Sequence, residues 1–248
     1  MSMSAMSETI KNALDECALG CRVLEMEGHG DMSLGHLSFR DPEGRGFWMK
    51  RNSVGLGEIM GSDDFVLIDW DGNQIAGKGR RHSEWPIHSE VLRNRPDVNV
   101  VAHSHPFHAC VFSASSEPLA PFTLAADYFI DVPRHQDEVA LITTKDEGQA
   151  MAMAMHTSFA VFVANHGVTF CGTSLSHAIC VGVFLEQACK AQLAGMSAGI
   201  GPVELTRAIR EKRRSQIMTP VHWDHSWNFF RRKLNARDGE SGPRPVYG

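Results

Sequence analysis

The chain has 248 residues, 43% of them hydrophobic, and a formal net charge of −5 at neutral pH. This length suffices for one large hydrophobic core, and the mild negative charge offers no general attraction to nucleic acid. No apolar run approaches the length that crosses a bilayer, and no signal-peptide pattern precedes the charged segment that begins at Glu8. We therefore expect a cytoplasmic protein that binds neither membranes nor nucleic acid.

The first half of the chain predicts a helix followed by a meander of strands. The helix is expected from Glu8 to Glu27, and Asp71-Gly72-Asn73 is typical of a hairpin turn. Pro86 suits the first turn of a helix, so a second helix is expected to begin there. Between these features lie short strands at 35–39, 46–49 and 65–69.

The second half predicts strands that alternate with helices. Strands are expected over 98–102 and 159–165, with a helix at 148–156, a long helix from Ser174 to about Ala194, and helical structure over 202–234 broken at Pro220. No repeat or low-complexity linker divides the chain. We therefore expect a single domain over 1–238, with 239–248 as a flexible tail.

The most informative motif is His103-Ser104-His105, which ends a strand rich in β-branched residues and is stopped by Pro106. The period of two along a strand points both imidazoles to the same side, where they supply half of a metal site. The alternative is a pair of half-buried histidines that hydrogen-bond to the backbone. The motif alone does not decide between the two.

Two further segments offer partners for this pair. His166 follows another apolar strand and precedes Gly167, so a third imidazole at a neighbouring strand end would complete a three-histidine site with an open position, typical of a catalytic metal. Asn165-His166-Gly167 is also a common turn. Glu84 precedes the helix at Pro86 and is either a helix cap or, beside the histidines, a general acid/base or a metal ligand.

Taken in order, these segments resemble one family, that of the class II aldolases and adducin head domains. The resemblance runs from about Asn12 to about Gly195. It implies a three-layer α/β/α sandwich around a mostly antiparallel sheet, assembled as a homotetramer with active sites between subunits. The motifs that carry it are Ser83-Glu84-Trp85-Pro86-Ile87-His88, the stretch from Arg95 to His105, and Asn165-His166-Gly167.

Carried over by position, the resemblance makes His103, His105 and His166 the ligands of one divalent metal ion per subunit and Glu84 the proton-transfer residue. Zn²⁺ or Mn²⁺ is expected, with Fe²⁺ or Co²⁺ as alternatives. The presence of all these residues argues against the adducin-like branch, whose head domain serves assembly and is not expected to keep the metal set.

The sequence departs from the family's sugar-phosphate aldolases where those enzymes hold phosphate with small polar residues and glycine. Cationic side chains in place of these small residues narrow the phosphate-binding site. Because a guanidinium group pairs well with a carboxylate, we expect a small-molecule carboxylate as substrate. The alternative is that Lys50 and Arg51 cap a solvated turn. The substrate-binding residues predicted from these stretches are Lys50, Arg51, Asn52, His36 and Ser83.

These departures favour a decarboxylase of a hydroxylated aromatic or related dicarboxylate, in which the metal stabilises an enolate-like intermediate and Glu84 or His82 supplies the proton. The second hypothesis is an aldolase that cleaves a hydroxy-keto, sugar-phosphate-like compound, with Glu84 moving the proton. A non-catalytic assembly domain is the third. Many such aldolases use a tyrosine to protonate the aldehyde, and the chain offers only Tyr128 and Tyr247.

The remaining cysteines and histidines suggest structural roles. The chain has six cysteines without a CxxC pair, which predicts free, buried thiols rather than disulfides or a zinc knuckle. His108 is expected in a pocket wall or a structural contact, His88 on a helix, and His29 in a turn or near substrate. Glu186 is expected to serve packing, an ion pair, or support of a metal histidine.

Overall fold

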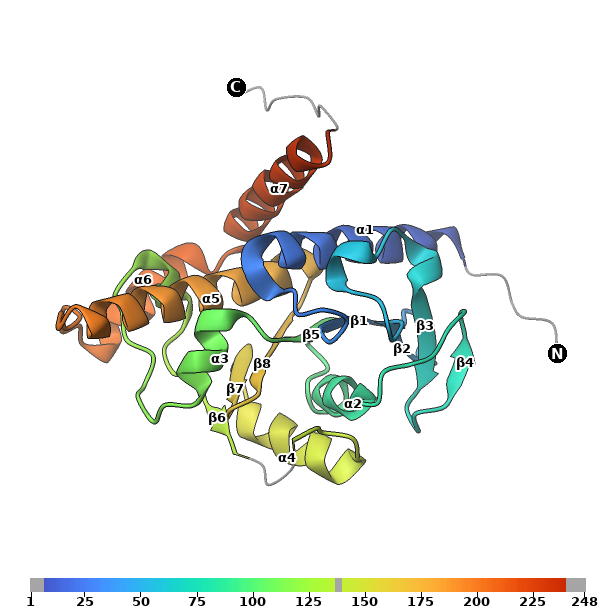
Figure 1. The fold of residues 1–248 in the computed structure, drawn as a ribbon, viewed down its shortest axis with the longest axis horizontal. Helices are drawn as coiled ribbons and strands as arrows, with labels where there is room; N and C mark the ends of the chain where they lie inside the picture. Colours follow the sequence, from blue (N-terminus) through green and yellow to red (C-terminus); the bar gives the residue numbers. More distant parts are fainter. Residues whose placement is uncertain (1–6, 137–139, 240–248) are drawn as a thin grey trace.

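One sheet of eight strands organises the computed structural model, which describes residues 7–136 and 140–239 (Figure 1). The strand order is β4-β3-β2-β1-β5-β8-β7-β6, and every neighbouring pair is antiparallel except β6 and β7. The predicted mostly antiparallel sheet is confirmed. Its strands are β1 (His36–Arg40), β2 (Gly46–Lys50), β3 (Phe65–Asp69), β4 (Gln74–Ala76), β5 (Val100–Ser104), β6 (Arg134–His135), β7 (Ala160–Val163) and β8 (Gly167–Gly172).

Helices cover both faces of this sheet, as the predicted sandwich requires. Figure 1 shows α1 and α5 on one side and α2 and α4 on the other, with α7 projecting from the first side. The helices are α1 (Glu8–Leu24), α2 (Trp85–Asn94), α3 (Phe107–Ser113), α4 (Lys145–Met155), α5 (Leu175–Ser197), α6 (Arg207–Ile217) and α7 (Pro220–Arg237). Short helical turns are η1 (Glu25–His29), η2 (Leu56–Glu58), η3 (Ser62–Asp64) and η4 (Leu124–Tyr128). None of the helices in the described parts of the chain is long and apolar enough to span a membrane.

The two hydrophobic clusters on either side of the sheet follow from strand alternation. In β5, Val100 and Ala102 join the cluster that α1 and α5 cover, whereas Val101 joins the cluster beneath α2 and α4. All three side chains are fully buried. Because β5 is buried on both faces at the middle of the sheet, it is a rigid platform for the histidines at its end.

Several predicted element ends differ from the observed ones for local reasons. Helix α1 ends at Leu24 because the chain passes into the π-helical turn η1, where Gly28 has a φ of 90°. Helix α5 continues to Ser197. The C-terminal helical region begins later than predicted, after the Thr206 cap, and its break is confirmed because Pro220 is the first residue of α7. Positions 240–248 of the predicted tail lie outside the described residues.

Helix α2 is fixed to the sheet by Arg40 of β1. The Arg40 guanidinium donates to the backbone carbonyls of Leu92, Arg95 and Val98, at the C-terminal end of α2 and in the turn that follows. These carbonyls lack helical partners, and a cation is favourable at this end of a helix dipole. The C-terminal end of α2 is thereby held against the sheet.

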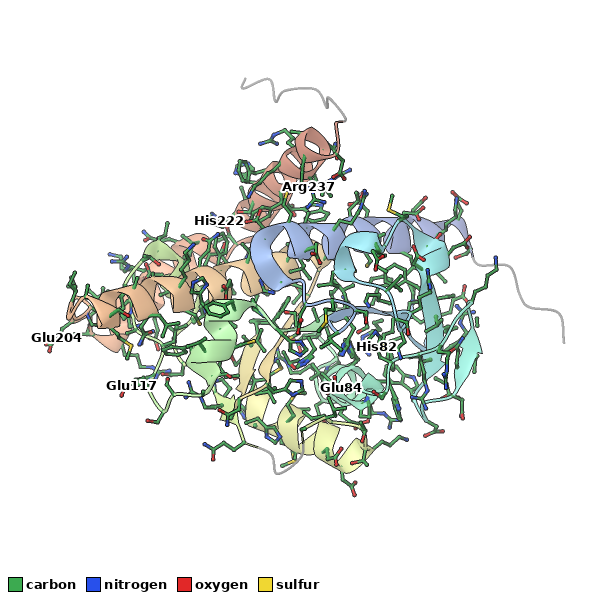
Figure 2. All side chains as sticks on the ribbon, viewed as in Figure 1. His82, Glu84, Glu117, Glu204, His222 and Arg237 are labelled. Atoms are coloured by element: carbon green, nitrogen blue, oxygen red, sulfur yellow. The ribbon has the colours of Figure 1, made fainter. Side chains whose placement is uncertain are left out.

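The projecting α7 contacts the body of the protein through a buried ring stack. His177 of α5 lies parallel to Trp223 of α7, with ring centroids 3.8 Å apart, and meets Phe159 on another side at 4.4 Å. Burial lowers the pKa of His177 to about 4, and the charges of Arg214 and Arg95 add to the shift. Figure 2 shows His222 and Arg237 of α7 well away from His82 and Glu84.

We expect this buried histidine to make the fold acid-sensitive. Between pH 6.5 and about 4 the unfolded chain binds a proton at His177 and the folded chain does not. The free energy of unfolding therefore falls as pH is lowered through this window, by up to about 1.4 kcal/mol per unit for this group. His177→Gln should flatten the dependence in urea unfolding of metal-free protein at about pH 7.5, 6 and 5. The exposed His225→Gln is the control, and curves for His177→Gln parallel to wild type would contradict the assignment.

Candidate metal centre and surrounding cavity

The central strand β5 delivers the first two histidines of the site. Within β5, His103 lies between His36 of β1 and Thr169 of β8 in the strand register. His105 follows the end of the strand, and Pro106 then caps helix α3. The predicted alternation is confirmed, because both rings lie on the same side with centroids 5.0 Å apart.

The third histidine lies in the hairpin between β7 and β8. Asn165 takes a φ of 56°, a left-handed conformation that asparagine tolerates, and this turns His166 back toward β5. Gly167 makes the close approach possible. A Cβ added there would lie 2.6 Å from the His105 ring and 2.6 Å from the Ser104 carbonyl oxygen. The conformation of Asn165 and the small size of Gly167 therefore bring the hairpin, and with it His166, close to β5.

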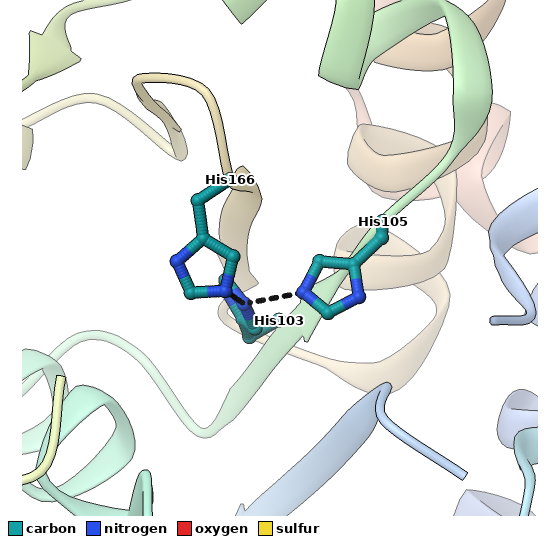
Figure 3. A group of neighbouring side chains, drawn as sticks. All are labelled: His103, His105 and His166. Atoms are coloured by element: carbon teal, nitrogen blue, oxygen red, sulfur yellow. Dashed lines mark hydrogen bonds between the residues drawn. The ribbon is translucent and has the colours of Figure 1, made fainter. Parts of the chain in front are cut away.

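The three rings converge on one point (Figure 3). The Nε2 atom of His103 lies 3.1 Å from Nε2 of His105 and 3.3 Å from Nε2 of His166. One ring nitrogen from each residue lies within 4.8 Å of the other two. Nitrogens that each bind one ion at about 2.1 Å are roughly 3.0–3.4 Å apart for octahedral to tetrahedral angles. Both distances from His103 fall in this range, and the three histidines together could hold a divalent cation.

The protonation of the rings also fits a cation. Burial lowers the pKa of His103 and His105 and lowers that of His166 to about 4, so all three are neutral at neutral pH, the form that binds metals. The Nδ1 atom of His105 faces Oδ2 of Asp31 at 3.1 Å, and Nδ1 of His103 faces Oγ1 of Thr169 at 3.0 Å. Contacts on Nδ1 leave Nε2 free to accept a cation.

Glu84 lies beside the histidines with its carboxylate free of helix capping. It is the N-cap residue of α2, yet its side chain makes no capping hydrogen bond. Instead Oε1 accepts from the backbone N–H of Ile142 at 3.1 Å and lies 4.0 Å from Nε2 of His166. Burial raises the pKa of Glu84 to about 7. A carboxyl group in this state can both release and accept a proton near neutral pH.

Behind Glu84 lies a chain of buried polar side chains. Oε2 of Glu84 is 3.5 Å from Nε2 of His36, whose Nδ1 is 2.7 Å from Nε2 of His88, and Nδ1 of His88 is 2.7 Å from Oγ of Ser38. Burial lowers the pKa of both histidines, to about 3 for His88. His36, which the sequence assigned to substrate binding, thus contacts Glu84 from the protein interior. His88 lies on α2, as predicted.

His82 and Lys50 are buried next to each other. Nε2 of His82 lies 3.4 Å from the Lys50 ammonium, and burial lowers the pKa of His82 to about 3. Lys50 donates to the backbone carbonyls of Val54, Ser33 and Arg51, and burial lowers its pKa to about 8. Lys50 therefore does not cap a solvated turn.

The other predicted substrate-binding residues lie outside the cavity of the histidines. Arg51 donates from Nε to Oδ1 of Asp64 at 3.0 Å. Asn52 and Ser83 line a separate hollow of about 490 Å³ together with Arg80 and Arg81. Because Ser83 and Glu84 are consecutive, this hollow and the histidine cavity flank the same short segment.

A cavity of about 870 Å³ opens onto the candidate metal centre. Its polar lining includes Asp31, Glu84, His105 and His166. Among the described residues, no lysine or arginine lines it. The apolar part of its wall includes Leu34, Phe107 and Leu141, whose exposed fractions are 46%, 71% and 52%. The cavity therefore offers apolar surface next to a candidate cation and a titratable carboxyl.

Some residues around the site escaped the sequence analysis. Asp31, Thr169 and Phe107 belong to separate segments and carry no local motif, although Phe107 follows His105 by two residues. Other candidates have partners elsewhere. The carboxylate of Glu186 accepts from Nδ1 and the backbone N–H of His108 and from Ala109, so it supports the start of α3 rather than a metal histidine. The six cysteines are free, as predicted.

The matching family model defines the class of protein. Residues 15–193 match the model of the class II aldolase and adducin N-terminal domain. This is more than half of the chain, and the chain therefore belongs to that family. Class II aldolases depend on a divalent metal, which agrees with the cluster of His103, His105 and His166.

Curated relatives include named decarboxylases. The chain is 29% identical to 3,4-dihydroxyphthalate decarboxylase of Arthrobacter keyseri over 203 residues, 77% of this chain and 82% of the relative. It is 30% identical to the meiotically up-regulated gene 14 protein of Schizosaccharomyces pombe over 73% of this chain and 71% of the relative. Decarboxylase NovR of Streptomyces niveus is 29% identical, over 67% of this chain and only 62% of the relative.

Solved structures share the fold along nearly the whole chain. An aldolase II superfamily protein from Pseudomonas syringae superposes with a TM-score of 0.83 at 24% identity, covering 94% of this chain and 96% of the other. L-fuculose 1-phosphate aldolase from Glaciozyma antarctica PI12 superposes with a TM-score of 0.81 at 24% identity, covering 98% and 97%. The fold is that of a class II aldolase, and with the decarboxylase relatives it places the chain in a superfamily of lyase-type enzymes.

Proposed function

We propose that this protein is a metal-dependent carbon–carbon lyase that decarboxylates a hydroxylated aromatic or related dicarboxylate. The observation that carries the proposal is the convergence of three neutral imidazoles beside Glu84, whose pKa is raised to about 7, in a cavity with an apolar wall. Relatives named as decarboxylases support the reaction type.

His103, His105 and His166 would hold one divalent ion per subunit through their Nε2 atoms. Such an ion, when bound, supplies a Lewis acid for the hydroxyl and carboxylate oxygens of the substrate. Zn²⁺ and Mn²⁺ both suit imidazole ligands, as do Fe²⁺ and Co²⁺. The histidines would reach such an ion from β5 and the β7–β8 hairpin, and the cavity side would stay open to the substrate.

Glu84 is the residue that moves the proton in this proposal. Its carboxyl group lines the cavity, and the Ile142 N–H holds Oε1 in place. With a pKa of about 7, the group can hold the proton that the ring carbon takes up when carbon dioxide leaves. His82 was the second predicted donor, and its deep pKa shift to about 3 makes its imidazolium scarce at neutral pH.

The apolar wall supports an aromatic ring as the substrate core. Phe107 and Leu141 present exposed side chains to the cavity, where a planar ring gains contact that a polyhydroxylated sugar does not. Contact with a substrate carboxylate stays a prediction for each of the residues named in the sequence analysis, which are Lys50, Arg51, Asn52, His36 and Ser83. Lys50 and His36 would act from the interior, and Arg51 would have to leave Asp64.

An aldolase acting on a sugar-phosphate-like compound is the second candidate, favoured by the fold shared with L-fuculose 1-phosphate aldolase. No tyrosine that could protonate an aldehyde is among the described residues that line the cavity. Tyr128 is 3% exposed and packs against Phe184 and His222. Tyr247 lies outside the described residues. The burial of Tyr128 favours the decarboxylase.

We further propose a cytoplasmic homotetramer whose cavities are completed by neighbouring subunits. Exposed apolar side chains that line the cavity, Phe107 and Leu141 among them, give such a neighbour a surface to cover. An adducin-like assembly role without catalysis is the least favoured hypothesis, because it leaves the histidine cluster and Glu84 without a purpose.

Product analysis with and without metal tests the reaction. With Zn²⁺ or Mn²⁺ we expect carbon dioxide release from hydroxylated aromatic dicarboxylates, with 3,4-dihydroxyphthalate as the first probe, because the cavity combines histidines that could bind a cation with an apolar wall for a ring. Dialysis against EDTA should abolish the release, and added metal should restore it. Aldehyde release from L-fuculose 1-phosphate without carbon dioxide from any dicarboxylate would favour the aldolase instead. Activity unaffected by chelation would reject both enzyme proposals.

A further inference from the structure

We propose that Asp31 is a positioning residue that fixes the orientation and tautomer of His105 and thereby sets the affinity of the site for its metal. This inference rests on the proposed function, because it takes the three histidines as metal ligands. Its basis is the contact between Oδ2 of Asp31 and Nδ1 of His105, at 3.1 Å. In the described parts of the chain, Asp31 has no ion pair with a lysine or arginine.

The direction of this hydrogen bond follows from its chemistry. An ionised carboxylate only accepts, so the proton of the His105 ring must lie on Nδ1. The lone pair of the ring then lies on Nε2, the atom 3.1 Å from Nε2 of His103. Asp31 therefore selects the one tautomer of His105 that can bind the cation at the shared point.

The rings of His103 and His166 have no partner on Nδ1 that can only accept a hydrogen bond among the described residues. His103 faces the Thr169 hydroxyl, which can donate as well as accept and does not by itself decide the tautomer. The described residues provide no hydrogen bond to Nδ1 of His166. His103 is held by its strand and is fully buried, whereas His105 follows the end of β5 and its side chain is 11% exposed. Because His105 lies beyond the strand end, the contact with Asp31 restrains a ring that the strand ladder does not hold.

The conformation of the loop after η1 sets the position of the Asp31 carboxylate. Gly28 has a φ of 90°, and a Cβ on Gly30 would lie 2.0–2.5 Å from the carboxylate of Glu25. The carbonyl of Asp31 accepts from the N–H of Leu34 at 2.9 Å, which closes the turn. Since Asp31 and Leu34 both line the cavity, the same turn shapes the substrate wall and restrains the metal ligand.

The test is metal affinity measured apart from catalysis. Zn²⁺ binding to the full chain is measured by competition with a chromophoric chelator, and Co²⁺ binding by its visible absorption. We expect Asp31→Ala to weaken Zn²⁺ binding by about 10–100-fold. Asp31→Asn, which keeps an accepting oxygen without the charge, should fall between Asp31→Ala and wild type, and its Co²⁺ spectrum should stay closer to that of wild type.

A structural role alone would show itself differently. The melting temperature of the metal-free protein should be the same for wild type and both variants, and Asp63→Ala, which removes an exposed carboxylate on η3, should leave metal affinity unchanged. Wild-type affinity in both Asp31 variants would overturn the inference, even if Asp31→Ala alone were poorly folded. Weaker binding together with no carbon dioxide from any dicarboxylate would sustain the inference and reject the proposed reaction.

Discussion

Replacing His166 by alanine is expected to leave the protein folded and without its metal. The side chain lies half-buried on the β7–β8 hairpin, so its removal disturbs the core less than the loss of the fully buried His103 would. The substitution removes one of the three candidate metal ligands, the His166 Nε2 atom that lies 3.3 Å from Nε2 of His103. The Lewis acid is expected to contribute several kcal/mol, so turnover should fall by roughly a thousand-fold or more.

Elemental analysis of the purified variant and its rate on the dicarboxylate identified for wild type check this expectation. The exposed His225→Ala serves as the matched control and should retain one ion per subunit. Stoichiometric metal with full activity in His166→Ala would remove this residue from the candidate ligand set. The far-ultraviolet circular dichroism of the two variants should agree, because neither side chain belongs to the hydrophobic core.

Replacing Glu84 by glutamine is expected to separate metal binding from chemistry. Glutamine has the same size and can still accept from the Ile142 N–H, so the segment before α2 should keep its position. It cannot hold or release a proton at neutral pH. Turnover should therefore fall by about 10²–10⁴-fold while the ion stays bound.

Glu90→Gln on the same helix is the matched control. Glu90 is also buried, but its carboxylate accepts from Ser89 and lies near Arg93, away from the histidines. We expect near-normal turnover for this variant, measured as initial rates at saturating metal. A fully active Glu84→Gln would exclude Glu84 as the proton-transfer residue, and loss of metal in this variant would instead make Glu84 a fourth ligand.

The histidine set was predictable from sequence because its signals are local. A β-branched run that ends at Pro106 fixes His103 and His105 to one side, and a glycine after His166 predicts a tight turn. The family resemblance supplied what local patterns lack, namely that residues 103 and 166 meet. The sheet order, in which β8 pairs with β5, gives the physical reason.

The cationic residues show where local reasoning stops. The position of Lys50 at a strand end does not reveal that three backbone carbonyls bind its ammonium inside the protein. Likewise Arg51 finds Asp64 thirteen residues later, and Asp31 meets His105 across 74 residues. Such contacts depend on the packed fold, because a charged side chain takes whichever partner the tertiary structure brings near.

The close approach of Gly167 to the His105 ring bears on how the site binds its metal ion. The β7–β8 hairpin and the central strand β5 belong to one hydrogen-bonded sheet, so the sheet itself sets the separation of the donor nitrogens. The metal ion then binds to a site that the folded chain has already formed, and its binding is not a step in folding. A chain depleted by a chelator should accept a fresh ion without renaturation, and ions whose radii demand a wider or narrower cage should be disfavoured by the rigidity of the scaffold.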